Sequence, residues 1–536
     1  MNFWTRSFLR WCVAPSSCKR PGYLLARWIF LRALGLIYFS AFYSLIFQIR
    51  GLLGPNGLLP AGSYLQEVAK AFGPARFWYA PTLLWSSSSS HALLALCSIG
   101  MIAALFLALN IWPRVTLFVC FVAFLSFVSA AQDFSGYQSD GMLLSAGFIS
   151  LFFAPPGLRP RWGEPSPPSR ASLFLLLLVW FTIYFESGIA KYFGGDPSWR
   201  NLTAMDQYYQ NGPLPTWIGW YTQQLPHAFH AACSFFILIT ELLVVWMGVL
   251  RRPFRMVCFF IVTPMQISII LTANYTFLNY LVLFLGVLLL DDLFLLRFLP
   301  QGWALPVRKN LDQSAEQSSS APAVATMANQ IAFTARLWIS ALLLGWVSYA
   351  MLFLLIGELS PGIPLPARPV AWIDPFRVAN RYGLFGRMTW ARYEIEFQGS
   401  NDGINWIPYP FRYKPQDLGQ APRIYAPYQP RFDWNLWFAS LGNWRENPFV
   451  LRTEELLLTN NADVLALFAG NPFAQAPPRQ VRAVLWQYWM TDISTKRKTG
   501  LWWRREYRGL YAPSIELAPD GKFFVLQWPQ GLPPPP

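Results

Sequence analysis

The sequence predicts an α-helical polytopic membrane bundle followed by a mostly β (α+β) C-terminal domain outside the membrane. Three observations lead to this prediction. Hydrophobic residues fill 54% of the 536 positions and aromatic residues 17%, whereas charged residues fill only 13%, about half the share found in soluble domains. Apolar runs long enough to cross a bilayer recur along 28–357. Beyond residue 370, charged residues are spread more evenly, as in a water-exposed domain.

Nine apolar runs are predicted to be membrane spans, because a bilayer core ~30 Å thick needs about 20 apolar residues in a helix. They are 28–49, 91–110, 115–132, 141–155, 172–190, 230–250, 256–275, 277–296 and 333–357. The first run begins late and is long enough to span, so we expect a retained anchor rather than a cleaved signal peptide. The fourth is short and has polar neighbours, so it is the weakest of the nine.

The basic residues predict a cytoplasmic N-terminus, since Lys and Arg are enriched in cytoplasmic loops. In that orientation the inside segments hold 16 Lys and Arg residues. The outside loops hold five, namely Arg50, Lys70, Arg76, Lys191 and Arg200. Nine spans then put everything after 357 outside, in a periplasm or a lumen, and an error of one span would reverse this. The net charge of +15 suits contact with anionic lipid head groups.

Composition divides the chain into six regions. They are a basic cytoplasmic N-tail (1–27), a transmembrane bundle of about eight spans (28–300), a Ser/Ala/Gln-rich flexible linker (301–332), the last span (333–357), a Pro-rich hinge (358–370) and a β-rich extracytoplasmic domain (371–536). The linker prediction rests on low-complexity polar composition.

Alternating apolar and polar residues predict strands in the last region. "ARYEIEFQGS" is followed by the turn "NDG" and by "INWIPYPFRYKP", and a second pair, "AVLWQYWMTD" and "GLWWRREYRGLYAP", flanks the basic turn Lys496–Lys498. Between these pairs, "WNLWFASLGNW" and "TEELLLTNNADVLALF" have helical spacing. We therefore expect a small β domain with inserted helices.

Four polar residues near the sixth predicted span form a stripe on one helical face. They are His227, His230, Ser234 and Glu241, and an ionisable residue in a span costs at least ~2.5–3.5 kcal/mol unless it is paired or functional. The stripe could line a water-filled or ligand-binding cavity, or it could form a helix-to-helix hydrogen bond that locks the bundle. We favour the second interpretation.

Lys191 lies where the fifth predicted span leaves the membrane. Its position favours snorkelling of the side chain to the interface. Desolvated at that place, it could instead act as a base. Tyr184, Ser187 and Lys191 share one helical face.

No metal site and no cofactor are predicted. His227 and His230 are i, i+3, but zinc usually needs three or four ligands, and His91 is the only other histidine. The sequence has no G-x-S-x-G elbow, no P-loop and no H-E-x-x-H helix. Basic residues are separated by apolar runs, so no nucleic-acid partner is expected.

Three long stretches resemble the lipase maturation factor family: "WIFLRALGLIYFSAFYSLIFQIRGLLGPNGLLPAGSYL" (28–65), "SGIAKYFGGDPSWRNLTAMDQYYQNGPLPTWIGWYTQQLP" (187–226) and most of 380–513. The resemblance implies a multi-span protein that helps secreted lipases fold and assemble into active homodimers, with its C-terminal domain in the lumen of the endoplasmic reticulum in animals. One motif departs from the family pattern. Where that pattern resembles Y-x-W-D-x-L-L-L-E-x-G, Ser139 and Ser145 replace the Trp and the Glu, which indicates a different client or role if those residues matter.

A weaker resemblance points to an enzyme. "YFESGIAK" is similar to the central membrane segment of vitamin K-dependent γ-carboxylases, which implies a base at Lys191. "TPMQISI" (263–269) offers no clear match to the histidine of that family. A shared bundle does not entail shared chemistry.

Two hypotheses follow. The leading one is a non-enzymatic folding or assembly factor for secreted lipases or related hydrolases, acting through the outer domain. Its candidate client-binding residues are Tyr428, Arg431, Phe432, Asp433, Trp434, Trp437 and Phe438, about half of which we expect to be domain core. The alternative is a quinone- or lipid-dependent membrane enzyme with Lys191 as base and the Glu241 stripe as its cavity. The expected partners are membrane lipids and a secreted hydrolase, and we favour a bacterial inner membrane over the endoplasmic reticulum.

Overall fold

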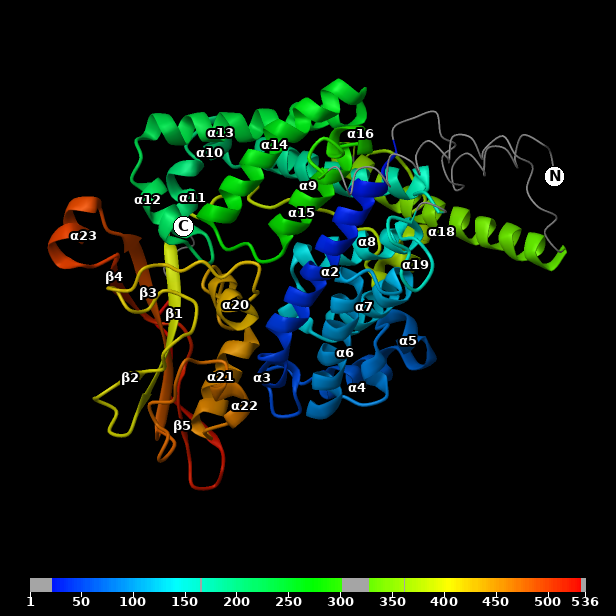
Figure 1. Ribbon diagram of the computed structural model, residues 1–536. Coiled ribbons are helices and arrows are strands. Elements are labelled where there is room, and N and C mark those ends of the chain that lie inside the picture. Colours follow the sequence, from blue (N-terminus) through cyan, green and yellow to red (C-terminus); the bar gives the residue numbers. More distant parts are fainter. Residues whose placement is uncertain (1–21, 164–165, 301–326, 361, 532–536) are drawn as a thin grey trace.

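Helices dominate the first two-thirds of the chain in the computed structural model, which describes residues 22–163, 166–300, 327–360 and 362–531 (Figure 1). The principal helices are α2 (Leu24–Ile46), α6 (Ser90–Ala108), α7 (Pro113–Val128), α8 (Gln138–Phe153), α9 (Arg170–Phe193), α13 (His227–Leu242), α14 (Arg252–Thr272), α15 (Leu278–Gly286) and α18 (Met327–Leu359). A small antiparallel sheet follows, so the predicted fold class, a helical membrane bundle and an α+β domain, is confirmed.

The number of long spans is smaller than predicted. Among the described residues, six helices are long and apolar enough to cross a membrane: Leu24–Ile46, Ser90–Ala108, Arg170–Phe193, His227–Val249, Arg252–Thr272 and Thr334–Leu359. The other three predicted spans are helices too, but α7 and α8 have 16 residues each and α15 has nine. Sixteen residues span only ~24 Å at 1.5 Å per residue. Prolines explain part of the short length of α7 and α8, since α7 starts at Pro113 and Pro155 follows α8.

Short helices fill the connections between the long ones. They are α3 (Ile49–Leu53), α4 (Ala61–Phe72), η1 (Gly73–Ala75), α5 (Arg76–Tyr79), η2 (Leu83–Trp85), η3 (Gln132–Ser135), α10 (Pro197–Arg200), α11 (Met205–Asn211), α12 (Trp217–Gln223), η4 (Val244–Val249), η5 (Val287–Leu289), α16 (Asp292–Leu295), α19 (Arg368–Ile373) and η6 (Asp374–Phe376). Of these, α10, α11 and α12 follow α9 and contribute to the site described below.

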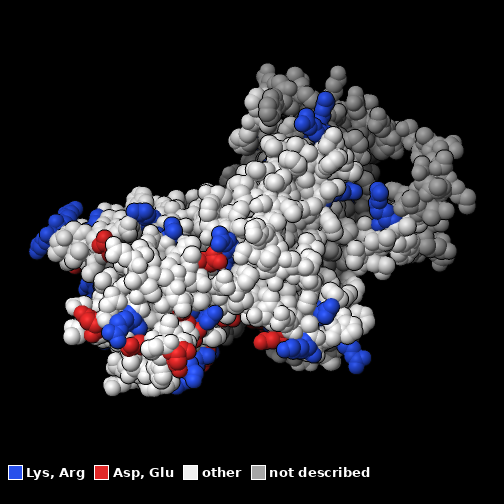
Figure 2. Space-filling view, turned by 90° about the horizontal axis from the view of Figure 1, so that it is seen from below, with Lys and Arg blue, Asp and Glu red and all other residues white. Residues whose placement is uncertain are grey.

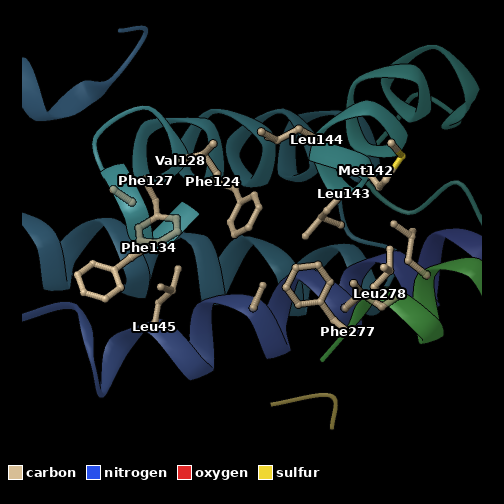
Figure 3. Close-up of a cluster of buried hydrophobic side chains, with 14 of the residues drawn as sticks. Leu45, Phe124, Phe127, Val128, Phe134, Met142, Leu143, Leu144, Phe277 and Leu278 are labelled. Carbon is tan, nitrogen blue, oxygen red and sulfur yellow. The ribbon is translucent and has the colours of Figure 1, made fainter. Parts of the chain in front are cut away.

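The core of the bundle is packed with aromatic and branched side chains from α2, α7, α8 and α15, together with Phe134 of η3 (Figure 3). Phe124 of α7 packs edge-on against Tyr38 and Phe42 of α2. The Tyr38 hydroxyl donates to the Leu143 carbonyl at 3.1 Å. Gly35 lets α2 approach α6 closely, because a Cβ there would lie 2.6 Å from the Ala108 nitrogen. Close packing of this kind fixes the helices that carry the site.

The C-terminal sheet is antiparallel, with the order β2-β1-β3-β5-β6 and β4 also paired with β3. Its strands are β1 (Arg392–Ser400), β2 (Ile407–Pro408), β3 (Gln480–Met490), β4 (Trp503–Leu510), β5 (Ser514–Leu517) and β6 (Phe523–Gln527). The helices of the domain are α20 (Arg431–Ala439), α21 (Pro448–Leu458), α22 (Ala462–Leu465) and α23 (Ile493–Thr499). The strands predicted from alternation are β1, β3 and β4, and the predicted helical stretches overlap α20 and α21 and contain α22.

Strand pairing differs in one respect from the expected hairpins. The first expected hairpin is reduced to two residue pairs between β1 and β2. The main partner of β1 is instead β3, from Arg392 opposite Tyr488 to Ser400 opposite Gln480. The second hairpin, β3 with β4, is confirmed, and its basic turn is the helix α23. The long-range β1–β3 pairing leaves no local sequence signal.

The C-terminal domain lies directly against the bundle (Figure 1). The residues expected to form a hinge pack back onto α18, where Trp346 Nε1 donates to the Pro369 carbonyl at 2.7 Å and the Tyr349 hydroxyl to the Pro366 carbonyl at 2.8 Å. In Figure 2, charged side chains gather towards the side on which the C-terminal domain lies, and the surface beside them is mostly uncharged. The N-tail up to residue 21 and most of the expected linker (301–326) lie outside the described residues.

Candidate functional site

A buried ion pair joins the two residues of the predicted enzymatic alternative. Lys191 Nζ, in the last turn of α9, lies 2.6 Å from both carboxylate oxygens of Glu241 on α13. The lysine is 6% exposed and the glutamate 6%. Gly188 permits this approach, because a Cβ at that position would lie 3.0 Å from the Cβ of Glu241. The Trp199 ring, 5.2 Å from Nζ, covers the amine.

Lys191 does not snorkel to the interface as its position in the sequence favoured. The side chain turns inward because Glu241 is within reach, and an ion pair shielded from water holds both partners more firmly than a surface contact would. No local pattern could reveal this, since the two residues are 50 positions apart.

The predicted polar stripe on α13 divides into two parts. His230, Ser234 and Glu241 are buried, whereas His227 is exposed and contacts Asp206 through Nδ1 at 2.9 Å. The Nδ1 atom of His230 lies 2.8 Å from the Met205 carbonyl, and Ser234 donates to the backbone of His230. Both interpretations left open by the sequence apply to Glu241, because it bonds to Lys191 of α9 and also lines a cavity.

This cavity has a volume of about 150 Å³ and is bounded by α9, α13, α14 and α15. The end of the cavity nearest the C-terminal domain is covered by α11 and by Tyr382, Leu384 and Phe385. Tyr184 and Gln266 form one polar wall, where the tyrosine hydroxyl donates to Oε1 at 3.0 Å. Gln266 in turn donates to the Asn279 carbonyl at 3.3 Å. The remaining walls are mostly apolar and aromatic.

One lining group, the Asn279 amide nitrogen, is buried without a hydrogen-bond partner, and the Tyr275 hydroxyl, also in the lining, interacts with the Tyr208 hydroxyl and makes no other hydrogen bond. The side chains of Asn279 and Tyr275 are 8% and 6% exposed. Buried polar groups are usually satisfied, so the Asn279 amide is available to bind a ligand. No local sequence signal marks Tyr275 or Asn279 as site residues.

The predicted client-binding residues are mostly interior. Arg431 is fully buried, and its guanidinium bonds to both carboxylate oxygens of Asp140 at 2.7 and 2.8 Å. It also donates to the Phe134 carbonyl at 2.6 Å and stacks over the Phe127 ring at 4.7 Å. A bidentate arginine pair with these additional bonds is the strongest form of such a contact. Arg431 therefore attaches the domain to the bundle and does not face a client.

The neighbours of Arg431 are divided between the interior and the surface. Phe432, Asp433, Trp434 and Trp437 are buried, Tyr428 is half-buried, and Phe438 is 45% exposed. The Trp437 indole donates to the Asn211 carbonyl of α11 at 3.1 Å. This burial agrees with the expectation that part of the set forms core. Of the set, only Phe438 has a large exposed surface that a partner could contact.

Asp433 is a buried carboxylate whose pKa is raised to about 6. Burial is the main cause, and it is partly offset by hydrogen bonds from the Lys414 and Tyr413 backbone nitrogens and by the Lys414 charge. The group shifts in this direction because its charged form is poorly solvated.

Two further contacts attach the domain to the helical bundle. Asn274, just beyond α14, accepts hydrogen bonds from the Tyr425 and Ala426 nitrogens at 2.6 and 3.0 Å and donates to the Arg423 carbonyl at 2.8 Å. Ser145, which replaces the Glu of the family pattern, lies 2.8 Å from the Asn380 amide nitrogen. The sequence did not identify Asn274 as an attachment residue, because side chain-to-backbone contacts across 150 residues leave no motif.

Comparison with known proteins gives matches over both parts of the chain. The family model described as the lipase maturation factor transmembrane domain matches residues 25–297, and the lipase maturation factor C-terminal domain matches residues 378–513. Among curated relatives, lipase maturation factor 1 of Bos taurus is 30% identical, over 96% of this chain and 93% of that protein. Lipase maturation factor 1 of Homo sapiens is 28% identical, over 96% and 92%. Lipase maturation factor 2 of Gallus gallus is 28% identical, over 92% and 81%.

No solved structure matches the chain. The two domain matches follow one another in the order that the fold itself has, bundle first and sheet domain second. The chain is a multi-pass membrane protein, and it belongs to the lipase maturation factor family.

Proposed function

We propose that this protein is a membrane-anchored folding and assembly factor for secreted lipases or related hydrolases, acting through its C-terminal domain. The observation that carries the proposal is the similarity to proteins named lipase maturation factor, which extends over both domains and almost the whole length of the chain. A lipase is accordingly the client class we propose.

The arrangement of the domain supports an extracytoplasmic site of action. The domain contacts the ends of the bundle that carry few basic residues, for example through Gln48 after α2 and Asn274 after α14. Basic residues gather at the opposite helix ends, including Arg252 and Arg255 at the start of α14. Since basic segments stay in the cytoplasm, this distribution supports a cytoplasmic N-terminus and an outer domain. Composition favours a bacterial inner membrane, whereas the named relatives come from animals.

A rigid attachment supports a role in which the bundle holds the domain in one orientation. Arg431 and Asp140 form a buried link, and Arg50 pairs with Asp463 at 2.5 Å nearer the surface. The segment before α20 lies along the bundle, where Ser40 of α2 donates to the Pro427 carbonyl at 3.0 Å and Tyr280 of α15 to the Ala426 carbonyl at 3.2 Å. A client would then meet a surface fixed relative to the membrane.

The edge strand β6 is the surface we propose for client contact. It ends the sheet order, and its sequence FFVLQ is exposed at every position. Trp528 follows it and is 56% exposed. Soluble proteins usually protect such edges with charges or bulges, and an exposed apolar edge can bind an extended segment of a partner by strand addition. An incompletely folded hydrolase offers such segments.

Co-expression tests this proposal. Candidate secreted lipases are produced with and without the full-length protein, and the specific activity and dimer content of the lipase are measured. We expect both to rise with the intact protein. Val525→Lys puts a charge on β6 and should reduce the gain, whereas Thr499→Lys, in the exposed helix α23, should not. If no lipase gains activity or co-purifies with the protein, the assembly role is contradicted.

A second candidate function is a lipid-dependent membrane enzyme, and the cavity around Lys191 and Glu241 favours it. Lys191 Nζ already donates to both carboxylate oxygens, so it could act as a base only after it has given up a proton, for which Glu241 is the nearest acceptor. Lys191→Met combined with Glu241→Gln removes the charges without leaving one unpaired. If lipase maturation persists in this double variant, catalysis by Lys191 is not needed for the assembly role.

A further inference from the structure

The cavity beside the Lys191–Glu241 pair opens sideways, towards the lipid. Its lining residues on α9 and α15, such as Tyr184 and Asn279, are buried. The two lining residues with the most exposed surface belong to α13 and α14, because Phe236 is 45% exposed and Ser268 is exposed, whereas Cys233 of α13 and Tyr382, Leu384 and Phe385 of the covering segment are only partly exposed. Both helices are apolar enough to span a membrane. The mouth between them therefore faces hydrocarbon and not water.

The charge of the cavity limits what can enter. Lys191 and Glu241 neutralise each other, and among the described lining residues no other ionisable group carries charge at neutral pH. A charged head group would have to lose its hydration without gaining a counter-ion, which is strongly unfavourable. The occupant should therefore be uncharged.

The Asn279 amide and the Tyr275 hydroxyl define the chemistry of the head. The Asn279 amide nitrogen is a donor without an acceptor, and the Tyr275 hydroxyl can donate or accept. Both residues line the cavity and are more than nine-tenths buried. A carbonyl, ester or hydroxyl oxygen would satisfy them.

The size of the cavity indicates which part of a ligand it holds. A volume of about 150 Å³ is several times the ~10–15 Å³ that one water molecule needs. A small oxygenated head group therefore fits in the cavity. The apolar chain of the ligand would pass between α13 and α14, past Phe236 and Ile269, into the bilayer.

We propose that this cavity binds the head of an uncharged lipid, bearing carbonyl or hydroxyl oxygens, that enters from the membrane between α13 and α14. A diacylglycerol and an isoprenoid quinone share this chemistry. The inference does not depend on the assembly role. It concerns the cavity of the second candidate function, but it is tested by binding without turnover, so a failure of binding and a failure of catalysis are separate results.

Photolabelling tests the proposal on the full-length protein in phosphatidylcholine nanodiscs. Three probes with a photoreactive group near the head are compared: a diacylglycerol, an isoprenoid quinone and a phosphatidic acid. We expect at least one uncharged probe to label residues of α9, α13 or α14 that line the cavity, and the phosphatidic acid to label them at least tenfold less. The probe that labels identifies the source of the lipid.

Variants at the mouth make the test specific. Cys233→Trp and Ser268→Trp, one on each side of the mouth, should each lower labelling by at least fivefold. Ile267→Trp, on the exposed face of α14 outside the lining, should leave it unchanged. Ser268 is exposed, so that variant reports even if Cys233→Trp does not fold. Labelling elsewhere only, equal labelling by phosphatidic acid, or undiminished labelling in Ser268→Trp would overturn the proposal.

Discussion

Arg431 is the residue on which the attachment of the domain depends most. Both of its terminal nitrogens are used by Asp140, and the pair is fully buried. Removing one partner of a buried ion pair leaves an uncompensated charge, which typically costs 3–5 kcal/mol. Arg431 therefore connects α20 of the C-terminal domain to Asp140 in α8, within the segment where Ser139 and Ser145 depart from the family pattern.

We expect Arg431→Met to lower the thermal unfolding temperature of the protein in detergent by a change equivalent to about 3–5 kcal/mol. Arg431→Met with Asp140→Leu should recover part of this loss, because no charge is left unpaired. Arg50→Met is the control, since the Arg50 side chain is 52% exposed and such pairs contribute about 1 kcal/mol or less. Equal effects of Arg50→Met and Arg431→Met would contradict the structural role.

Asp433 makes stability depend on pH. Its pKa in the folded protein is about 6 against an ordinary value of 3.8, so the folded state binds the proton more tightly than the unfolded state. Proton binding by Asp433 therefore stabilises the folded protein fully below pH 4, and this stabilisation is lost as the pH rises through 6. Asp433→Asn mimics the protonated carboxyl and keeps an oxygen for the Tyr413 and Lys414 nitrogens.

The variant Asp433→Asn should be more stable than the parent at pH 7, by up to roughly 3 kcal/mol for a shift of about two pKa units, and about equal to it at pH 4. Unfolding of both proteins in detergent is followed at pH 4, 5, 6 and 7. A constant difference between the two proteins across this range would contradict the raised pKa.

At the scale of the elements, the contact between α9 and α13 fixes the candidate site. Gly188 lies where the two helices touch, and a side chain there would meet both Leu242 and Glu241 at about 3 Å. The Lys191–Glu241 pair lies one turn further along α9. The distance between the helices therefore determines both the ion pair and the shape of the cavity.

We predict that Gly188→Val separates α9 from α13 and destabilises the protein by about 1–3 kcal/mol, the usual cost of overpacking. Gly345→Val is the matched control, because Gly345 also lies in a membrane helix but has open space at its Cβ position. Thermal unfolding in detergent compares the two. If Gly345→Val is as harmful as Gly188→Val, helix propensity and not packing explains the loss.

At the scale of the whole molecule, orientation is the property on which the proposed function depends. The domain contacts one end of the bundle, and the helix ends with most basic residues lie at the other. A client that is secreted can meet the domain only if the first of these ends is outside.

Reporters fused after Pro536 check this orientation in a bacterial host. Alkaline phosphatase should be active there, because it folds only outside the cytoplasm, and green fluorescent protein exported in an unfolded state should stay dark. Fusions after Gln301, on the side we expect to be cytoplasmic, should give the opposite pattern. A fluorescent fusion after Pro536 without phosphatase activity would reverse the topology and remove the basis for action on secreted clients.

The sequence by itself determined the fold class, the positions of the long helices and of strands β1, β3 and β4, and the family resemblance. These follow from local information: apolar runs reveal helices in lipid, and alternation reveals strands. It also identified Lys191, Glu241 and the inward side of the α13 stripe, because polar residues in apolar runs are conspicuous.

Only the tertiary structure decided which of these residues meet. The partner of Lys191 is 50 residues away and that of Arg431 is 291 away, and such distances leave no periodic signal. Burial likewise removed four neighbours of Arg431 from the expected client surface, since Phe432 and Asp433 lie in the interior of the domain itself and Trp434 and Trp437 pack against the bundle. Whether an aromatic residue faces a partner or its own core depends on what packs against it, and that is settled only when distant segments come together.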